Sequence, residues 1–577
     1  MQRWFPLALL LAIALQGALA APAGASSPSV SIAPVTPEGD TGRYPLSSAR
    51  AQHALVVTAN PHATDAALAI MRRGGSAIDA AIAAQAVLGL VEPQSSGFGG
   101  GLFLVLRDGK QVMSYDGRET APASARPDRF LDKQGQPLAF HAAVGSGRAV
   151  GVPGVVAALA AAHRASGRLP WRTLFTPAIT LARQGFLVSP RLHALLERDA
   201  LLREHPASRT YFYDQDGNAW PVGHRLRNPD YAHTLLWLAR KGPTAFYRGP
   251  EAQALIRILR EGGSDLAPSD WSAYRARVSP ALCAPYRQWN VCTAPPPSGG
   301  WTVLQTLRIL DGFPYTGDLP LHLHHLLEAE RLSFADRQRY SADPSQIPVP
   351  LTGLLDDGYL ATRRAMISEQ SMNTAPAGVP PGLAPPWGDD GQLREHGTTH
   401  LVIADPQGQW VSMTSSIEDA FGSRLMAGGM LFNNQLTDFS FLPTENGHPL
   451  ANAVAPGKRP RSAMSPVIVL DAAGQPRLAV GSPGGSRIIG YVLRALVASL
   501  DQGLSPGATV ATPLILSRNG PTEIDQDLPA SLRDSLAIHG QHFQPGDLNS
   551  GLAVIAREAD TLEGAADPRR EGKASGF

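Results

Sequence analysis

Hydroxyl side chains occur at both ends of a predicted hairpin in GTTHLVIADPQGQWVSMTSSIEDAFGS, which begins at Gly397. If ADPQGQW forms the turn, antiparallel pairing about Gln407 places Ser416 opposite Thr398. Paired residues in antiparallel strands carry their side chains on the same face, so these two hydroxyls are expected to face one another. An ordinary hairpin is the simpler interpretation, because threonine is a common strand residue.

The Thr398 hydroxyl could be a nucleophile if a base lay beside it. A cut between Gly397 and Thr398 would supply one, because it creates an α-amino group with an ordinary pKa of about 7.7 to 8.0. Gly397 lacks a Cβ, so its peptide can adopt a strained conformation in which the hydroxyl reaches the preceding carbonyl carbon. The segment 372–396 is rich in proline, glycine and charge, and is predicted to be an exposed loop that can move after a cut.

The stretch GSPGGSRII places Gly484 and Gly485 between a predicted strand at 476–481 and a predicted helix at about 486–501. Backbone N–H groups at such a junction can point into one concavity and stabilise an oxyanion that forms at a carbonyl under attack. A tight turn without a catalytic role is the alternative.

The two cysteines of the chain, Cys283 and Cys292, flank a predicted hairpin turn almost symmetrically. The N-terminus, MQRWFPLALLLAIALQGALAAPAGA, is typical of a signal peptide that is cut after Ala20 or, alternatively, after Ala25. We therefore expect the mature protein to be periplasmic or secreted, in an oxidising compartment. A Cys283–Cys292 disulfide is predicted there, with two buried free thiols as the alternative.

The composition of the 577 residues, 44% hydrophobic and 17% charged, is that of a globular chain with a large core. A net charge of +1 without a long run of basic residues argues against nucleic acid as a partner. No apolar stretch after the signal peptide reaches about 18 residues, so no membrane anchor is expected once the signal is removed.

A predicted helix, LPLHLHHLLEAERLSFADRQRY, carries His322, His324, His325 and Glu328. His324 and Glu328 are one turn apart and could bind a metal ion. The sequence offers no second cluster of His, Asp or Glu to complete the site. We therefore predict a partly exposed helix face and no metal site.

Four motifs together resemble the γ-glutamyltranspeptidase family of N-terminal-nucleophile hydrolases: TTHLVIADPQGQWVSMTSSIEDAFGS, LFNNQLTDFS, PGKRPRSAMSP and GSPGGSRII. The resemblance continues upstream through GGSAIDAAIAAQAVLGLVEPQ, YDGRETAP and VGVPGVVAAL. It implies a four-layer αββα sandwich and a precursor that cuts itself. The expected parts are a signal peptide at 1–20, a linker at 21–45, a large subunit at 46–397 and a small subunit at 398–577, the two subunits sharing one fold.

By position, the resemblance assigns Thr398 as nucleophile and new N-terminus, and Ser416 as an assisting hydroxyl. It places the oxyanion hole at Gly484 and Gly485. The substrate-binding residues that it implies are Arg118 and Ser462 for the α-carboxylate, and Glu418, Gln435 and Asp438 for the α-amino group.

The chain departs from the family pattern in four places. Ala463 stands where the family has a second serine, which removes a hydroxyl from the carboxylate pocket; a hydrogen bond to a charged group is worth about 1.5 to 3 kcal/mol. Ser416 replaces the usual threonine, and Glu418 stands where asparagine is common. The segment SFLPTENGHPLANAVAPGK is short and has no Tyr or Trp to close over a substrate, so water would enter and hydrolysis would compete with transfer.

These observations lead us to expect a secreted γ-glutamyl hydrolase and transpeptidase that uses no cofactor. It would cleave γ-glutamyl amides such as glutathione through a γ-glutamyl-Thr398 acyl-enzyme, with water or an amino acid as acceptor. An acylase of the cephalosporin or glutaryl type is one alternative, favoured by Ala463 and disfavoured by Gln435 and Asp438. An unprocessed family member that binds without catalysis is another.

Overall fold

The computed structural model describes residues 39–382, 386–392 and 396–577, and these residues belong to one compact unit. The expected signal peptide at 1–20 and most of the linker at 21–45 lie outside the described residues. Within those three ranges, no helix combines the length and the apolar character that crossing a bilayer requires.

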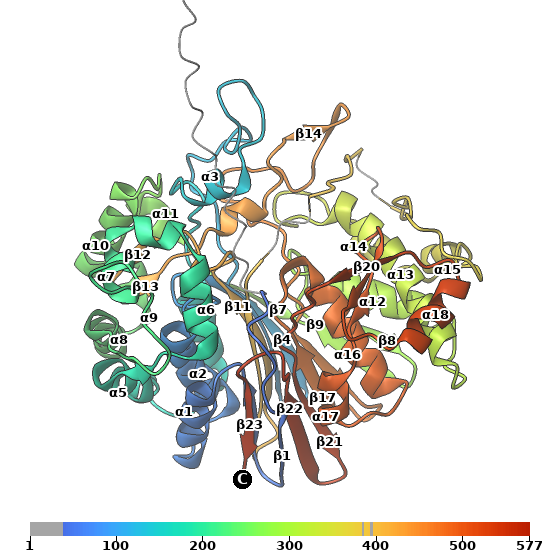
Figure 1. The fold of residues 1–577 in the computed structure, drawn as a ribbon, viewed down its shortest axis with the longest axis horizontal. Helices are drawn as coiled ribbons and strands as arrows, with labels where there is room; N and C mark the ends of the chain where they lie inside the picture. Colours follow the sequence, from blue (N-terminus) through green and yellow to red (C-terminus); the bar gives the residue numbers. More distant parts are fainter. Residues whose placement is uncertain (1–38, 383–385, 393–395) are drawn as a thin grey trace, which may run out of the picture. The chain divides into compact units, whose positions relative to one another are not determined.

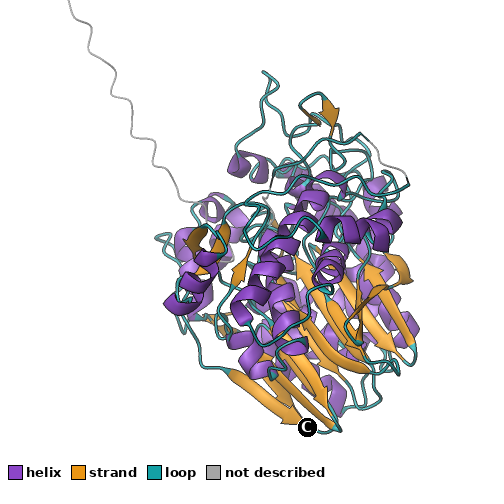
Figure 2. Ribbon diagram, turned by 90° about the vertical axis from the view of Figure 1, so that its right-hand side faces the viewer, coloured by secondary structure: helices purple, strands orange, loops and turns teal. Residues whose placement is uncertain are grey.

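Two antiparallel sheets of seven strands lie between two layers of helices (Figure 1, Figure 2), which confirms the expected αββα sandwich. The order in the first sheet is β23 (Lys573–Gly576), β2 (Leu55–Thr58), β10 (Thr399–Ala404), β11 (Trp410–Ser416), β3 (Gly101–Asp108), β4 (Gln111–Asp116) and β7 (Arg277–Pro280). The order in the second is β1 (Ser47–Ala51), β22 (Thr561–Ala566), β21 (Ala553–Glu558), β17 (Pro476–Gly481), β16 (Val467–Leu470), β9 (Trp289–Thr293) and β8 (Leu282–Tyr286).

Helices cover the outer face of each sheet. On the first sheet lie α1 (Pro61–Arg72), α2 (Ala77–Val91) and α4 (Val155–Ser166), and on the second lie α12 (Gly300–Leu310), α13 (Leu319–Tyr340) and α16 (Ile488–Leu500). The other helices are α3 (Phe140–Val144), α5 (Thr176–Gln184), α6 (Pro190–Arg198), α7 (Pro206–Phe212), α8 (Pro229–Lys241), α9 (Pro243–Tyr247), α10 (Pro250–Glu261), α11 (Pro268–Ala273), α14 (Leu351–Leu354), α15 (Asp357–Arg364), α17 (Pro506–Ala511) and α18 (Ala530–Ile538).

Short strands complete the structure. They are β5 (Phe186–Leu187), β6 (Arg225–Leu226), β12 (Met426–Ala427), β13 (Met430–Leu431), β14 (Thr444–Glu445), β15 (His448–Pro449), β18 (Ile515–Leu516), β19 (Thr522–Asp525) and β20 (Phe543–Gly546).

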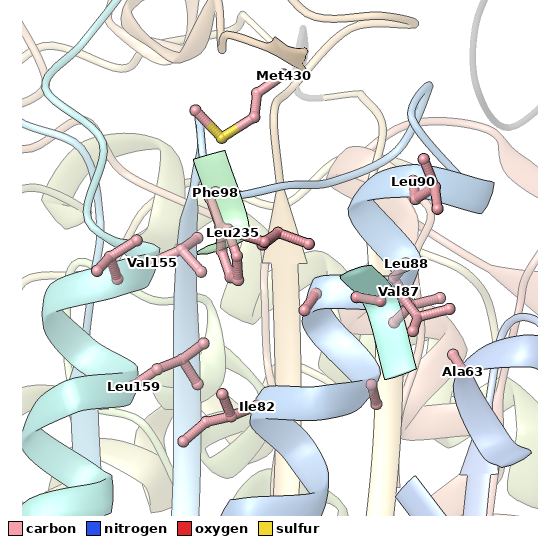
Figure 3. Close-up of a cluster of buried hydrophobic side chains, with 14 of the residues drawn as sticks. Ala63, Ile82, Val87, Leu88, Leu90, Phe98, Val155, Leu159, Leu235 and Met430 are labelled. Carbon is pink, nitrogen blue, oxygen red and sulfur yellow. The ribbon is translucent and has the colours of Figure 1, made fainter. Parts of the chain in front are cut away.

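The core is divided between the two faces of the first sheet. Leu401 and Ile403 of β10 belong to the cluster under α1 and α2, whereas Val402 and Ala404 belong to the cluster between the sheets. In the first cluster, Ile82 on α2 lies near Leu159 on α4, and Phe98 lies above them (Figure 3). β10 is therefore buried on both faces and holds its first residues rigidly.

The hairpin that carries Thr398 has the register predicted from its turn. Val402 pairs with Ser412 and Ala404 with Trp410, and the ladder runs from Thr399 opposite Ser415. Each sheet contains strands that precede Thr398 in the sequence and strands that follow it. In the first sheet, β2, β3 and β4 precede it, whereas β10, β11 and β23 follow it. A cut at Gly397 would therefore leave the two pieces hydrogen-bonded to each other.

Two further sequence features have defined places. Cys283 on β8 faces Cys292 on β9, and the two are joined by a disulfide. The prediction of a partly exposed face on α13 is confirmed for His325 but was wrong for His322, His324 and Glu328, which are buried. Residues distant in sequence cover them: His322 bonds to Asp501 at 2.8 Å, and the ring of His324 stacks on that of His539.

Candidate active site

Two hydroxyl groups converge on the carbonyl group of Gly397. The Thr398 hydroxyl donates to the Gly397 oxygen, and Ser416 Oγ donates to the same oxygen at 2.6 Å. Thr398 and Ser416 are buried, and Gly397 has a φ of +36°, a left-handed conformation that favours glycine. The two hydroxyls therefore share an acceptor, whereas the sequence had predicted only that they face one another.

Ser416 is held in place by the chain that follows it. Its Oγ accepts a hydrogen bond of 2.8 Å from the backbone N–H of Glu418 while it donates to Gly397. Successive hydrogen bonds of this kind polarise one another. This arrangement draws electron density away from the Gly397 carbonyl carbon, which makes that carbon easier to attack.

Thr399 points to the opposite face of the sheet from Thr398. Its hydroxyl donates to Glu92 at 3.1 Å, just beyond the end of α2. Glu92 is buried, and this burial raises the pKa of its carboxyl group. This contact anchors the first residue of β10 from the helical layer, and the sequence pattern did not reveal it because the two residues are far apart in the chain.

Arg118 lies buried beside the residues expected to bind a substrate. It pairs with Asp438, and it donates to the backbone oxygens of Pro460 at 3.2 Å and Arg461 at 2.5 Å. Gln435 Nε2 donates to Asp438 at 2.7 Å. The structure thus brings together Arg118, Gln435 and Asp438, and Ser462 follows Arg461 directly.

A second carboxyl group, that of Glu119, lies in this pocket and was not singled out from the sequence. Its Oε2 is 3.8 Å from Arg118 Nη1, and neither of its oxygens has a hydrogen-bond partner in another described residue. Burial raises the pKa of Glu119 to about 8, against the opposing effect of Arg118. Burial thus favours the protonated form of Glu119, and Asp438 forms the close ion pair with Arg118.

Glu418 lies next to the expected cut and contacts the chain before it. Its Oε1 accepts hydrogen bonds from the backbone N–H of His396 at 3.2 Å and from His396 Nδ1 at 3.3 Å, and Asn434 donates to its other oxygen. Burial raises the pKa of Glu418 to about 8, although the hydrogen bond from His396 acts in the opposite direction. Neither His396 nor Asn434 had been assigned a role, although Asn434 lies inside the LFNNQLTDFS motif.

The raised pKa of Glu418 gives the uncut chain a pH-dependent stability. Between its ordinary pKa of 4.5 and the raised value of about 8, the folded chain holds a proton that the unfolded chain has released. Stability should therefore fall as the pH rises from 5 to 8. We expect the melting temperature of a Thr398→Ala chain, which lacks the attacking hydroxyl, to fall over this range, and to fall less in the Thr398→Ala/Glu418→Gln chain. Equal slopes of melting temperature against pH in the two chains would contradict the assignment to Glu418, because Glu119 is present in both chains.

Gly484 and Gly485 lie where β17 leads into α16 through a short 3-10 helix at Gly485–Arg487. Gly484 has a φ of +140°, and a Cβ there would lie 2.4 Å from the ring of Tyr491. At the end of β17, a Cβ on Gly481 would lie 2.2 Å from the imidazole ring of His400, two residues after Thr398. The turn is therefore tight, needs glycine, and follows a strand that contacts the start of β10.

Comparison with known proteins agrees with this architecture. Residues 63–577 match the family model described as Gamma-glutamyltranspeptidase. The chain is 35% identical to the glutathione hydrolase proenzyme of Bacillus subtilis (strain 168), over 91% of each chain. It is 33% identical to the glutathione hydrolase proenzyme of Escherichia coli (strain K12), over 90% of this chain and 91% of the relative.

A solved structure gives the same result for the fold. The crystal structure of cephalosporin acylase from Bacillus halodurans aligns with a TM-score of 0.78 at 27% identity, over 93% of this chain and 97% of the acylase. Since the family model spans nearly the whole described chain and the match to the Bacillus subtilis relative covers 91% of each chain, the chain belongs to the gamma-glutamyltranspeptidase family of enzymes.

Proposed function

We propose that this chain is a secreted, self-processing γ-glutamyl hydrolase and transpeptidase. The observation that carries the proposal is the convergence of the Thr398 and Ser416 hydroxyls on the Gly397 carbonyl. Secretion rests on the signal-like N-terminus, and the names of the relatives, glutathione hydrolase proenzymes, support both the substrate class and the processing.

Processing begins when Thr398 Oγ attacks the carbonyl carbon of Gly397. The new C–O bond forms, the peptide C–N bond breaks, and the hydroxyl proton passes to the departing nitrogen. Ser416 stabilises the oxyanion that forms at Gly397 during this step. The break of the C–N bond frees the Thr398 amine of the small subunit. Water then hydrolyses the ester, which releases the Gly397 carboxylate of the large subunit and restores the Thr398 hydroxyl.

Turnover uses the amine that processing has created. The α-amino group takes the proton from Thr398 Oγ, which attacks the γ-amide carbonyl of the substrate. The amide C–N bond breaks, the α-amino group passes the proton to the departing amine, and an acyl-enzyme remains. The backbone N–H groups of Gly484 and Gly485 stabilise the oxyanion in this step. Water or an amino acid then accepts the γ-glutamyl group, and water competes well because the short segment at 440–458 has no Tyr or Trp to cover the site.

The pocket beside Arg118 has polar atoms that fit a glutamyl group. Arg118 Nη1 is a buried donor without a hydrogen-bond partner among the described residues, and Gln435 Oε1 is a buried acceptor in the same condition. A positively charged hydrogen-bond donor suits an α-carboxylate, and a hydrogen-bond acceptor beside Asp438 suits an α-ammonium group. Ser462 would add a hydroxyl on the carboxylate side and Glu418 an oxygen on the amine side.

The preference for an α-amino group separates this function from that of an acylase. We expect γ-glutamyl p-nitroanilide to be hydrolysed faster than glutaryl p-nitroanilide, by about 10-fold or more, because the glutaryl group leaves Gln435 and Asp438 without an ammonium partner. The measurement is the kcat/KM of each compound at pH 7.5.

Faster hydrolysis of the glutaryl compound would establish the second candidate, an acylase of the cephalosporin or glutaryl type. Two observations favour that candidate: Ala463 lacks the second hydroxyl of the carboxylate pocket, and a cephalosporin acylase shares the fold.

A further inference from the structure

Arg118, the residue proposed to bind the α-carboxylate, is held at its main chain as well as at its guanidinium group. Its peptide N–H donates to Asp116 Oδ1 at 2.8 Å. Its carbonyl oxygen accepts a hydrogen bond of 2.7 Å from the hydroxyl of Tyr274, which lies 156 residues away in the chain. Tyr274 was not singled out from the sequence. A buried tyrosine thus contacts the main chain of a proposed substrate-binding residue.

The pairing of two strands places Tyr274 beside Arg118. β4 ends at Asp116, and β7 begins at Arg277, which lies opposite Asp116 in the antiparallel ladder. In such a ladder, the residues that follow one strand run beside those that precede the other. Arg118 lies just beyond the end of β4, and Tyr274 lies between α11 and the start of β7. The contact therefore follows from the register of the first sheet.

The ring of Tyr274 is fixed by its neighbours. It stacks on the ring of Tyr247, with 5.7 Å between centroids and 10° between planes, and the guanidinium carbon of Arg459 lies 5.7 Å from its centroid. The hydroxyl fits beside Gly154, where a Cβ would lie 2.1 Å from it. Burial raises the pKa of Tyr274, so the hydroxyl stays protonated at neutral pH. It is therefore a firmly held hydrogen-bond donor.

Arg118 also carries the donor that we assign to the substrate. Its Nη1 makes no hydrogen bond to a described residue, and Glu119 Oε2 lies 3.8 Å from it. The other guanidinium nitrogens are occupied, because Nε donates to Pro460 and Nη2 donates to Asp438 and Arg461. A binding group must be held within about 0.5 Å of its productive position. The place of Nη1 therefore depends on how firmly the Arg118 main chain is held.

We propose that Tyr274 is a positioning residue for the carboxylate of the substrate. Its hydroxyl holds the Arg118 carbonyl and thereby fixes the place of Nη1, without taking part in the chemistry at Thr398. This inference rests on the proposed function, because it takes Arg118 as the ligand of the α-carboxylate. Both residues belong to the proposed large subunit, so the contact lies within one chain before and after the cut.

Tyr274→Phe tests the inference in the full-length chain, because it removes the hydroxyl and keeps the ring with its packing. We expect the KM for γ-glutamyl p-nitroanilide to rise about fivefold, with kcat changed less than about twofold. The KM for glutaryl p-nitroanilide should rise by the same factor, because that compound keeps the carboxylate. The kcat/KM for the 4-aminobutyryl anilide, which lacks the carboxylate, should stay unchanged. A merely structural role would affect all three compounds alike.

Tyr231→Phe is the matched control. Tyr231 is also buried in the proposed large subunit, and its hydroxyl donates to the backbone oxygen of Ala86, on α2, at 2.8 Å. The control loses the same kind of hydrogen bond, so its melting temperature should fall by about as much as that of Tyr274→Phe. We expect its KM values to equal those of the unaltered enzyme for all three compounds.

The outcomes separate this inference from the proposed function. An unchanged KM in cut Tyr274→Phe enzyme would overturn the inference, as would an equal loss for the 4-aminobutyryl compound or an equal rise in KM for Tyr231→Phe. A Tyr274→Phe chain that was not cut would also overturn it, since the hydroxyl would then serve processing. If the unaltered enzyme hydrolysed only the glutaryl compound, the proposed function would fall, but a rise in KM for that compound would still support the role of Tyr274.

Discussion

Thr398→Ala is expected to leave the chain in one piece and to abolish γ-glutamyl turnover. The hydroxyl that lies against the Gly397 carbonyl is lost, and the amine that should act as the base in turnover is never made. Loss of a nucleophile that acts together with its base lowers kcat by about 10⁴-fold or more. Denaturing gel electrophoresis measures the cut, intact mass locates it, and release of p-nitroaniline measures turnover.

Two substitutions serve as controls for this result. Thr398→Ser keeps the hydroxyl and should be cut, more slowly. Thr399→Ala removes a hydroxyl from the adjacent residue, but that hydroxyl binds Glu92 on the opposite face of the sheet, so the cut should proceed. A Thr398→Ala chain that was still cut before residue 398 would show that the nucleophile lies elsewhere. An unaltered chain that stayed uncut would favour the non-catalytic binding protein.

Arg118→Gln is expected to lower kcat/KM for γ-glutamyl p-nitroanilide by about 10²-fold or more, mainly through KM. The substitution removes the positive charge proposed to bind the α-carboxylate and breaks the buried ion pair with Asp438. Processing should continue, because the hydrogen bonds to the Gly397 carbonyl come from Thr398 and Ser416. The measurement is steady-state kinetics on protein shown by gel to be cut.

Arg107→Gln is the matched control for the loss of a buried arginine. Arg107 lies near the C-terminal end of β3. It donates to the backbone oxygen of Gly408 at 2.7 Å, in the turn of the β10–β11 hairpin. Its kcat/KM should stay within about threefold of the unaltered value. A 4-aminobutyryl anilide, which lacks the α-carboxylate, gives the decisive comparison. If Arg118→Gln slowed it as much as the γ-glutamyl compound, Arg118 would not be the carboxylate ligand.

The sequence predicted those features of the site that depend on neighbouring residues. The turn at ADPQGQW set the pairing of β10 with β11, because in a hairpin the turn fixes the register. The left-handed backbone conformation at Gly397 agrees with the expectation that a glycine there permits a strained conformation. The family resemblance supplied the αββα architecture, which no local pattern would have given.

Features that depend on distant residues were not predicted. Arg118 and Asp438 are 320 residues apart, and their pairing in the uncut chain follows from the packing of β4 against the loop that follows β13. The raised pKa values of Glu119 and Glu418 are consequences of burial, which a motif does not report. The burial of His322 and His324 on α13 was missed for the same reason, since Asp501 after α16 contacts His322 and His539 after α18 stacks on His324.

Each sheet contains strands from both sides of Thr398 in the sequence. This arrangement has a consequence for how the cut protein would fold and unfold. The uncut chain folds as a single molecule, whereas the cut enzyme would have to reassemble from two chains that each carry incomplete sheets. Refolding would then depend on concentration and would expose unpaired strand edges that favour aggregation. The proposed self-cleavage would make folding a step that each molecule completes once, and the working lifetime of the cut enzyme would be set by how slowly it unfolds.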